Sequence, residues 1–170
     1  IYNTRGLVDS FTNARGQVVH YFYDVSGNIL TIDYDGDTPD VYYDYDLHNR
    51  VRRIEDGTGV YVVTYDNASR LATIDGPWQD DTITYGYDDF GRVTTVTAQG
   101  SRQLTYNYDI LHRLQNIQLG EQNFSYDYLD SISPLVEKLT RPSSSYTTYS
   151  YNGLHQLTGV VNNSTTALIN

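Results

Sequence analysis

The chain has 170 residues, which is enough for one domain with a real core but not for several independent ones. Its 21 acidic residues outnumber its 11 basic ones and give a net charge of -10, which argues against nucleic-acid binding and against docking on anionic membranes. It has no cysteine and no apolar run of about 18 residues, so disulfides, thiolate metal sites and a membrane span are not expected. The 18 Tyr and 13 Gly favour an all-β protein of many short strands.

A ten-residue pattern recurs along the whole chain. Its clearest copies are YDNASRLATI at 65–74 and YDDFGRVTTV at 87–96. The first position is Tyr, the second is acidic or an amide in every copy but one, the seventh is aliphatic and the tenth is apolar. Successive copies begin 20 to 23 residues apart, at Tyr2, Tyr23, Tyr45, Tyr65, Tyr87, Tyr108, Tyr128 and Tyr151.

The residues before each first-position Tyr predict a strand. They alternate, in chain order, as YFY at 21–23, YDY at 43–45, YGY at 85–87, YNY at 106–108, YDY at 126–128 and YSY at 149–151. Alternate residues share a face of a strand, so one face is predicted to be a ladder of Tyr and the other to be wet. The Tyr and aliphatic positions are expected to bury their face. Positions seven and ten lie on one face only if a β-bulge separates them, which the sequence does not prove.

A turn is predicted after each Tyr, because Asp bonds downstream amides and Gly supplies a left-handed residue. The fifth position holds Gly6, Gly27, Asn49, Ser69, Gly91, His112 and His155. Asn and His tolerate positive φ, whereas Ser fits less well. In the deviant copy Leu129 replaces the acidic residue, and two extra residues restore the pattern at Val136 and Leu139. The structural residues of the repeat are therefore Tyr23, Asp24, Gly27, Tyr45, Asp46, Tyr65, Asp66, Tyr87, Asp88, Gly91, Tyr108, Asp109 and Tyr151.

A second turn follows each repeat, for example at 35–36 and 56–57, so each repeat is predicted to be one antiparallel β-hairpin of about 21 residues. The pattern Y-D-x-x-G-R-L-x-x-I at this spacing resembles the YD repeat, also called the RHS repeat, over essentially the whole chain. The resemblance implies a spiralling or solenoid-like sheet. In bacterial toxin complexes and polymorphic toxins such sheets enclose a toxic C-terminal segment, and in teneurin-type receptors a similar shell belongs to an adhesion protein. The family's C-terminal core region, with its self-cleavage carboxylates, has no counterpart in this sequence.

The resemblance implies a non-enzymatic structural scaffold, a section of a secreted extracellular shell, bacterial in origin, that encloses a toxin or other cargo. The alternative is an exposed extracellular fibre or adhesin wall that binds glycans or protein partners. Residues 1–170 are interpreted as a single array of about eight YD repeats. Roughly 16 strands would close a ring only about 25 Å wide, which is too narrow to hold a folded cargo, so the array is interpreted as a piece of a larger protein. The expected partners are the rest of the parent polypeptide, or neighbouring copies, joined through edge strands. No cofactor is expected.

Other candidate sites are weaker. Asp33, Asp35 and Asp37 have the D-x-D-x-D spacing of a calcium loop, but Thr38 stands where an EF-hand loop needs Gly. A solvated turn is the favoured interpretation of this stretch.

No catalytic site is expected. Three of the four His (His48, His112 and His155) fall at turn positions, and no nucleophile or phosphate-binding motif is present. The Tyr ladder and Trp78 could stack sugar rings, although filling of the interior by Tyr is the favoured interpretation.

Overall fold

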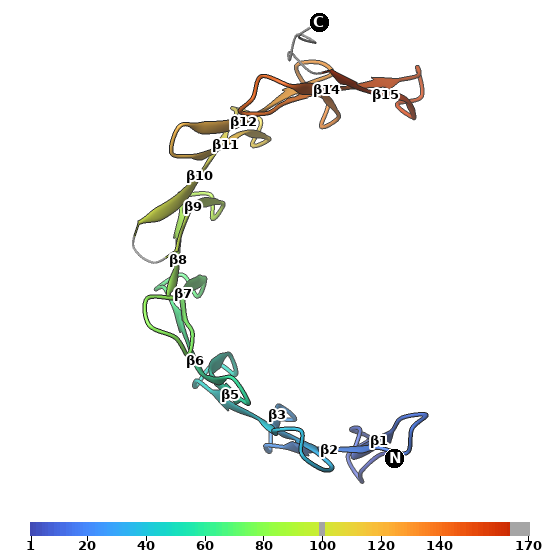
Figure 1. Ribbon diagram of the computed structural model, residues 1–170, viewed down its shortest axis with the longest axis vertical. Helices are drawn as coiled ribbons and strands as arrows, with labels where there is room; N and C mark the ends of the chain where they lie inside the picture. The colour runs from blue at the N-terminus through green and yellow to red at the C-terminus, as the bar shows by residue number, and fades with distance from the viewer. Residues whose placement is uncertain (99–100, 164–170) are drawn as a thin grey trace, which may run out of the picture. The chain divides into compact units, whose positions relative to one another are not determined.

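The computed structural model describes residues 1–98 and 101–163, and these residues form 15 strands. The strands belong to one sheet in which their order is the order of the chain, and the pairs given by register are all antiparallel (Figure 1). The predicted fold class, an all-β array of consecutive hairpins, is confirmed. Within the described residues no helix is long and apolar enough to cross a membrane.

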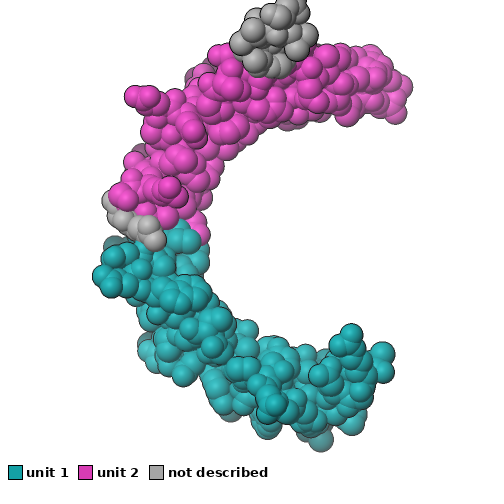
Figure 2. Space-filling model, in the orientation of Figure 1, with its two compact units in different colours: residues 1–84 teal, residues 85–170 magenta. Residues whose placement is uncertain are grey.

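The chain divides into two compact units, residues 1–84 and residues 85–170 (Figure 2). The first unit opens with a bridge between Tyr2 and Val8 that closes the first turn. Its strands, including the start of β8, are β1 (Ser10–Thr12), β2 (Val18–Tyr23), β3 (Ile29–Tyr34), β4 (Val41–Tyr45), β5 (Val51–Asp56), β6 (Gly59–Tyr65), β7 (Leu71–Asp75) and β8 (Ile83–Tyr87).

The second unit continues the same alternation of strand and turn. It contains the end of β8 and then β9 (Val93–Ala98), β10 (Arg102–Tyr108), β11 (Leu114–Leu119), β12 (Gln122–Tyr128), β13 (Val136–Thr140), β14 (Tyr146–Tyr151) and β15 (Leu157–Asn163).

A β-bulge at the start of the second strand sets the face of each repeat. In the β10–β11 pair, Tyr108 faces Leu114 and Tyr106 faces Ile117, while the register shifts by one residue between them. The extra residue places positions seven and ten of the pattern on the face that carries the Tyr ladder, which simple alternation would not do. The same shift occurs at Tyr23, Tyr45, Tyr65, Tyr128 and Tyr151.

The deviant repeat returns to this register after a longer turn. Leu129 N donates to the Leu135 carbonyl oxygen, so the turn contains two more residues than the others. Tyr128 then faces Val136, and Tyr126 faces Leu139. The insertion is therefore absorbed entirely by the turn, as the sequence predicts.

The face opposite the Tyr ladder is polar, and its side chains bond across the strands. The hydroxyl oxygens of Thr64 and Thr73 lie 2.6 Å apart, and Asn107 Nδ2 donates to Asn116 Oδ1 at 2.8 Å. The two residues of each pair lie directly opposite each other on neighbouring strands, where cross-strand contacts stabilise a sheet.

The Tyr face is less buried than the sequence predicts. None of the described hydrophobic side chains is buried, and the buried residues are Ser10, Ser133 and Thr147. The tyrosines and aliphatic residues of the ladder are mostly half-buried, because they are covered only by neighbours within the same sheet and by no second layer. The cohesion between repeats must therefore come largely from contacts along the sheet.

Candidate functional site

Each hairpin turn is built around the acidic residue or amide that follows the first-position Tyr. Asp46 Oδ1 accepts hydrogen bonds from His48 N at 2.8 Å and Arg50 N at 3.0 Å. The backbone closes the same turn through Asp46 N to the Arg50 carbonyl oxygen and Asn49 N to the Asp46 carbonyl oxygen. A carboxylate that accepts local amides in this way stabilises the turn through contacts within five residues of the chain. Equivalent amide bonds are accepted by the side chains of Asn3, Asp24, Asp66, Asp88, Asp109 and Asn152.

The fifth position of the pattern is left-handed in every copy that follows the pattern. The φ angles are 76° at Gly6, 92° at Gly27, 59° at Asn49, 65° at Ser69, 80° at Gly91, 65° at His112 and 60° at His155. Gly is preferred at such a site because a Cβ is crowded there.

Two linking turns have the same geometry, which the sequence analysis did not anticipate. Asn13 Oδ1 accepts from Arg15 N and Gln17 N, with Gly16 at a φ of 82°. The Arg141–Ser145 turn places Ser144 at a φ of 63°. The signal for the first of these, Asn followed three residues later by Gly, is the same one that the main pattern uses.

The first-position Tyr joins each repeat to the one before it. Tyr128 Oη donates to the Leu114 carbonyl oxygen at 2.8 Å, and Leu114 is the seventh position of the preceding repeat. The same bond, between 2.7 and 2.8 Å long, joins Tyr23 to Val8, Tyr45 to Ile29, Tyr65 to Val51, Tyr108 to Val93 and Tyr151 to Val136.

An arginine at the sixth position makes a second connection between repeats. Arg113 Nε donates to Asp109 Oδ2 at 2.6 Å in its own turn, while its guanidinium carbon lies 4.2 Å from the centre of the Tyr128 ring. Its Nη1 donates to the Ser133 carbonyl oxygen at 2.6 Å, in the next turn. Matching stacks are found for Arg50 on Tyr65 at 4.1 Å and for Arg92 on Tyr108 at 4.3 Å.

We call this set the clasp: the second-position Asp, the sixth-position Arg and the Tyr that begins the next repeat. Sequence reasoning identified its Tyr and Asp but gave no role to the Arg. The available signal was the recurrence of Arg at position six in Arg50, Arg70, Arg92 and Arg113. Since guanidinium is planar, one such side chain can pair with a carboxylate and stack on a ring at the same time.

The surroundings of the second-position Asp and the first-position Tyr shift the pKa values of these two groups in opposite directions. The side-chain hydrogen bond from Arg50, with help from backbone amides, lowers the pKa of Asp46 to about 2. The amide of Arg70 lowers the pKa of Asp66 in the same way. Burial raises the pKa of the Tyr45 and Tyr128 hydroxyls, so these stay protonated as donors.

One copy of the clasp is incomplete. Arg92 Nη1 lies 2.9 Å from His112 Nδ1 at the fifth position of the next repeat. The fifth position after Arg50 is Ser69, and Arg50 Nη1 is buried without a hydrogen-bond partner. The two copies thus differ in the residue at the fifth position of the next repeat, which is His112 after Arg92 and Ser69 after Arg50.

The acidic stretch that resembles a calcium loop pairs through its backbone with the neighbouring strand β2. Asp33 lies in β3 opposite His20, and Asp35 N donates to the Val18 carbonyl oxygen at 3.1 Å. Asp37 lies in the loop that leads to β4. Across residues 1–98 and 101–163, no group of three or more His, Cys, Asp or Glu side chains is placed to hold a metal ion.

The remaining polar candidates also have local roles. Asp81 accepts hydrogen bonds from Gly76 N at 3.0 Å and Trp78 N at 2.9 Å, which orders the loop before β8.

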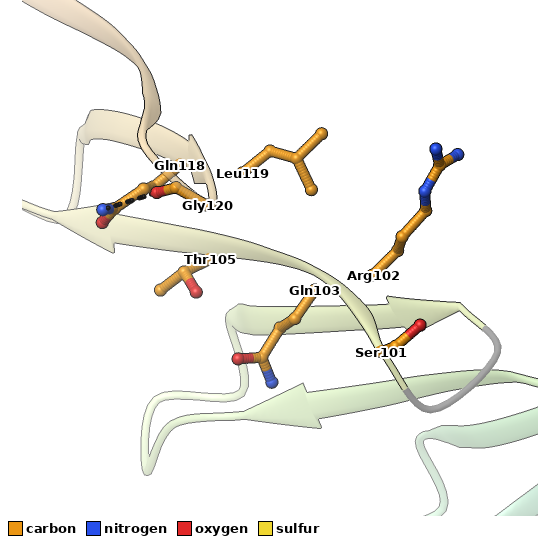
Figure 3. A pocket seen from close by; sticks show the side chains of 7 residues that line it. All are labelled: Ser101, Arg102, Gln103, Thr105, Gln118, Leu119 and Gly120. Atoms are coloured by element: carbon orange, nitrogen blue, oxygen red, sulfur yellow. Dashed lines mark hydrogen bonds between the residues drawn. The ribbon is translucent and has the colours of Figure 1, made fainter.

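An open groove of about 500 Å³ lies between the start of β10 and the end of β11. Figure 3 shows that the Gln118 amide folds back to the Gly120 carbonyl oxygen, while the Arg102 side chain extends away from the sheet. The residues that line the groove are Ser101, Arg102, Gln103, Thr105, Gln118, Leu119 and Gly120.

The chain is similar in fold to three solved structures that contain TcdB2-TccC3 or TccC3. It aligns with a crystal structure of TcdB2-TccC3-TEV at a TM-score of 0.73 and 15% identity, covering 97% of this chain and 10% of that one. It aligns with TcdB2-TccC3 without its hypervariable C-terminal region at a TM-score of 0.72 and 16% identity, covering 91% and 9%. For a Photorhabdus luminescens Tc holotoxin pore the TM-score is 0.61 and the identity 21%, covering 97% and 9%.

The chain thus spans about a tenth of the length of each of these proteins. No curated protein matches it in sequence. The RHS Repeat family profile matches residues 87–123, which include the YDDFGRVTTV copy and the turn after Tyr108. Residues 87–123 therefore match the RHS repeat, and the hairpin fold that contains them recurs along the described residues.

Proposed function

We propose that this chain is a section of the wall of a secreted RHS-repeat shell that encloses a toxin or other cargo. The observation that carries the proposal is the bond from the first-position Tyr hydroxyl to the preceding repeat, which recurs along the chain and which the clasp reinforces at Arg50, Arg92 and Arg113. A globular enzyme gathers unlike residues at one place, whereas this chain repeats the same contacts along its length. Its role is architectural and non-catalytic.

The absence of a buried hydrophobic core in the described residues supports a wall rather than a compact domain. A single layer of strands gives a large surface for few residues, and the clasp compensates for the missing core through hydrogen bonds and stacking. The fold shared with a TcdB2-TccC3 structure and with a Photorhabdus luminescens Tc holotoxin pore is consistent with a bacterial, secreted protein.

The edge of β15 is the expected junction with further repeats of the parent polypeptide or with a neighbouring copy. Leu157 occupies the seventh position, whose carbonyl oxygen accepts a Tyr hydroxyl in the earlier copies. Within residues 1–98 and 101–163, no such donor reaches Leu157. A following Tyr would form the same hydroxyl bond to Leu157 and would continue the sheet by strand pairing.

The experiment that tests the proposal is electron microscopy of the complete natural protein that contains this chain. A closed hollow particle with additional density inside is the expected result. An open fibre or a stacked array would overturn it.

The alternative, an exposed wall that binds glycans, is favoured by one observation. Trp78 lies in the loop before β8 with 65% of its surface exposed, and Trp rings stack readily on sugars. Titration of the chain with a panel of oligosaccharides, followed by Trp78 fluorescence, tests this function. A response that saturates for one glycan class would support it, and a flat response across the panel would count against it.

A further inference from the structure

The polar face of the first unit carries two exposed aromatic rings in one row. Phe22 on β2 and Tyr42 on β4 both face Thr31, which lies between them on β3. Their exposed fractions are 53% and 45%, although both lie within strands. Two strand spacings separate the rings by about 10 Å. Neither residue belongs to the clasp, because the first-position tyrosines occupy the opposite face.

Carboxylates surround the outer ring of this row. Tyr42 Oη donates to Asp40 Oδ2 at 3.1 Å, and Glu55 lies directly opposite Tyr42 on β5. The hydrogen bond to Asp40, the charge of that group and the charges of Asp33 and Glu55 together raise the pKa of the Tyr42 hydroxyl. The negative field at this ring is therefore produced by side chains from two strands, β3 and β5, and from the loop before β4.

The charge of this face is only partly balanced. Arg53 pairs with Glu55 at 2.6 Å and lies 3.8 Å from Asp44. No basic side chain among the described residues forms an ion pair with Asp33 or Asp40. Residues 1–84 hold 14 of the 21 acidic side chains of the chain but 6 of the 11 basic ones, so they carry 8 of its 10 net negative charges.

We propose that this aromatic–acidic face, formed by Phe22, Asp33, Asp40, Tyr42 and Glu55, binds an extended basic segment of polypeptide. The ammonium and guanidinium groups of Lys and Arg interact favourably with the faces of aromatic rings and with carboxylates, and their long side chains can reach both. Charge complementarity selects this partner, since an anionic one would be repelled. The inference goes beyond the wall role and does not depend on it.

The test uses the complete 170-residue chain and a fluorescein-labelled octapeptide of alternating Gly and Arg. Fluorescence anisotropy at low and at physiological salt gives the affinity. We expect saturable binding that weakens with salt and that is absent for the matching peptide of Gly and Glu. Tyr42→Leu and Phe22→Leu should each weaken binding about 2- to 5-fold, because they keep an apolar side chain but remove the ring. Asp33→Asn should weaken it by a similar factor.

Two variants in the second unit serve as matched controls. Phe90→Leu removes an exposed ring, and Asp127→Asn removes one exposed carboxylate on the polar face, so each makes the same chemical change away from the proposed site. Both should leave the affinity unchanged. Equal losses for Asp127→Asn and Asp33→Asn would mean attraction by net charge alone and would overturn the proposal. So would a ring-independent affinity, a lack of binding, or displacement of the peptide by a neutral cello-oligosaccharide.

Discussion

The Tyr128 hydroxyl donates to the Leu114 carbonyl oxygen at 2.8 Å, so the last residue of β12 is bonded to the first residue of β11. The bond joins one repeat to the one before it, on the face where Tyr108 faces Leu114. Because the bond uses a backbone oxygen, the seventh position can be any aliphatic residue, and Val, Ile and Leu all occur there.

Removal of one such hydroxyl should destabilise the chain measurably. Tyr108→Phe removes the hydrogen bond to Val93 and keeps the ring under Arg92. We expect a loss of about 1 kcal/mol in the free energy of unfolding, measured by urea denaturation. Tyr106→Phe is the matched control, since Tyr106 lies on the same strand and face but its hydroxyl bonds to no described residue. Equal midpoints for the two variants would contradict a structural role for the first-position hydroxyl.

The sixth-position Arg should not be replaceable by Lys. Arg113→Lys keeps the positive charge but loses the stack on Tyr128 and the fork that reaches both Asp109 and Ser133. A destabilisation of about 1–2 kcal/mol is expected in thermal or urea melts. Arg102→Lys, at an exposed position with no ion pair among the described residues, should have little effect. Equal unfolding midpoints for the two variants would show that Arg113 stabilises the chain through its positive charge alone, and not through the stack and the forked hydrogen bonds.

Glycine at a left-handed turn position should tolerate substitution poorly. Gly91 has a φ of 80°, and a β-branched side chain is strained in this region. Gly91→Val should cost at least about 1–2 kcal/mol of stability, whereas Asp89→Ala in the same exposed turn should change it by less than about 0.5 kcal/mol. Urea melts of the two variants provide the comparison, and equal midpoints would argue against the left-handed conformation at Gly91.

The incomplete clasp at Arg50 offers a stabilising substitution. Ser69→His should supply the acceptor that His112 provides for Arg92, and His also tolerates the φ of 65° found at Ser69. We expect a gain of about 1 kcal/mol in a urea melt. Ser69→Gly relieves the backbone without adding an acceptor, so it separates the two effects. If Ser69→Gly raises the stability and Ser69→His does not, the missing hydrogen-bond partner of Arg50 Nη1 does not reduce the stability of the chain.

Acid should weaken the clasp through its carboxylates. The pKa of Asp46 lies at about 2 in the folded chain, below its ordinary value of 3.8, because Arg50 and backbone amides hydrogen-bond the ionised form. The stability that Asp46 contributes is therefore present above pH 4 and is lost as the pH falls toward 2. Asp46→Asn should be less stable than the parent at pH 6, and the difference in melting temperature should shrink between pH 4 and pH 2. A constant difference over that range would contradict the role of the charge.

Much of the local structure follows from the sequence because the same pattern recurs at a regular spacing, so the prediction does not depend on a single match. One copy with Asp at the second position and Gly at the fifth is a common turn, but several copies at a spacing of 20 to 23 residues give the hairpins, their order and the left-handed residues. Even the two-residue insertion near Pro134 could be assigned to a turn, since the pattern resumes after it. The bulge could be suggested but not established, because it is a property of strand pairing.

The sequence by itself determined the strands, the turns and the face of the residues that alternate before each first-position Tyr, since these depend on local spacing along the chain. Only the tertiary structure decided what those residues contact. It placed Arg113 on Tyr128, left Arg50 Nη1 without a partner, and showed the Tyr ladder half-buried instead of buried. The physical reason is that periodicity assigns a residue to a face, whereas its burial and partners depend on whether another layer covers that face. No second layer covers it among the described residues, so contacts from one repeat to the next take its place.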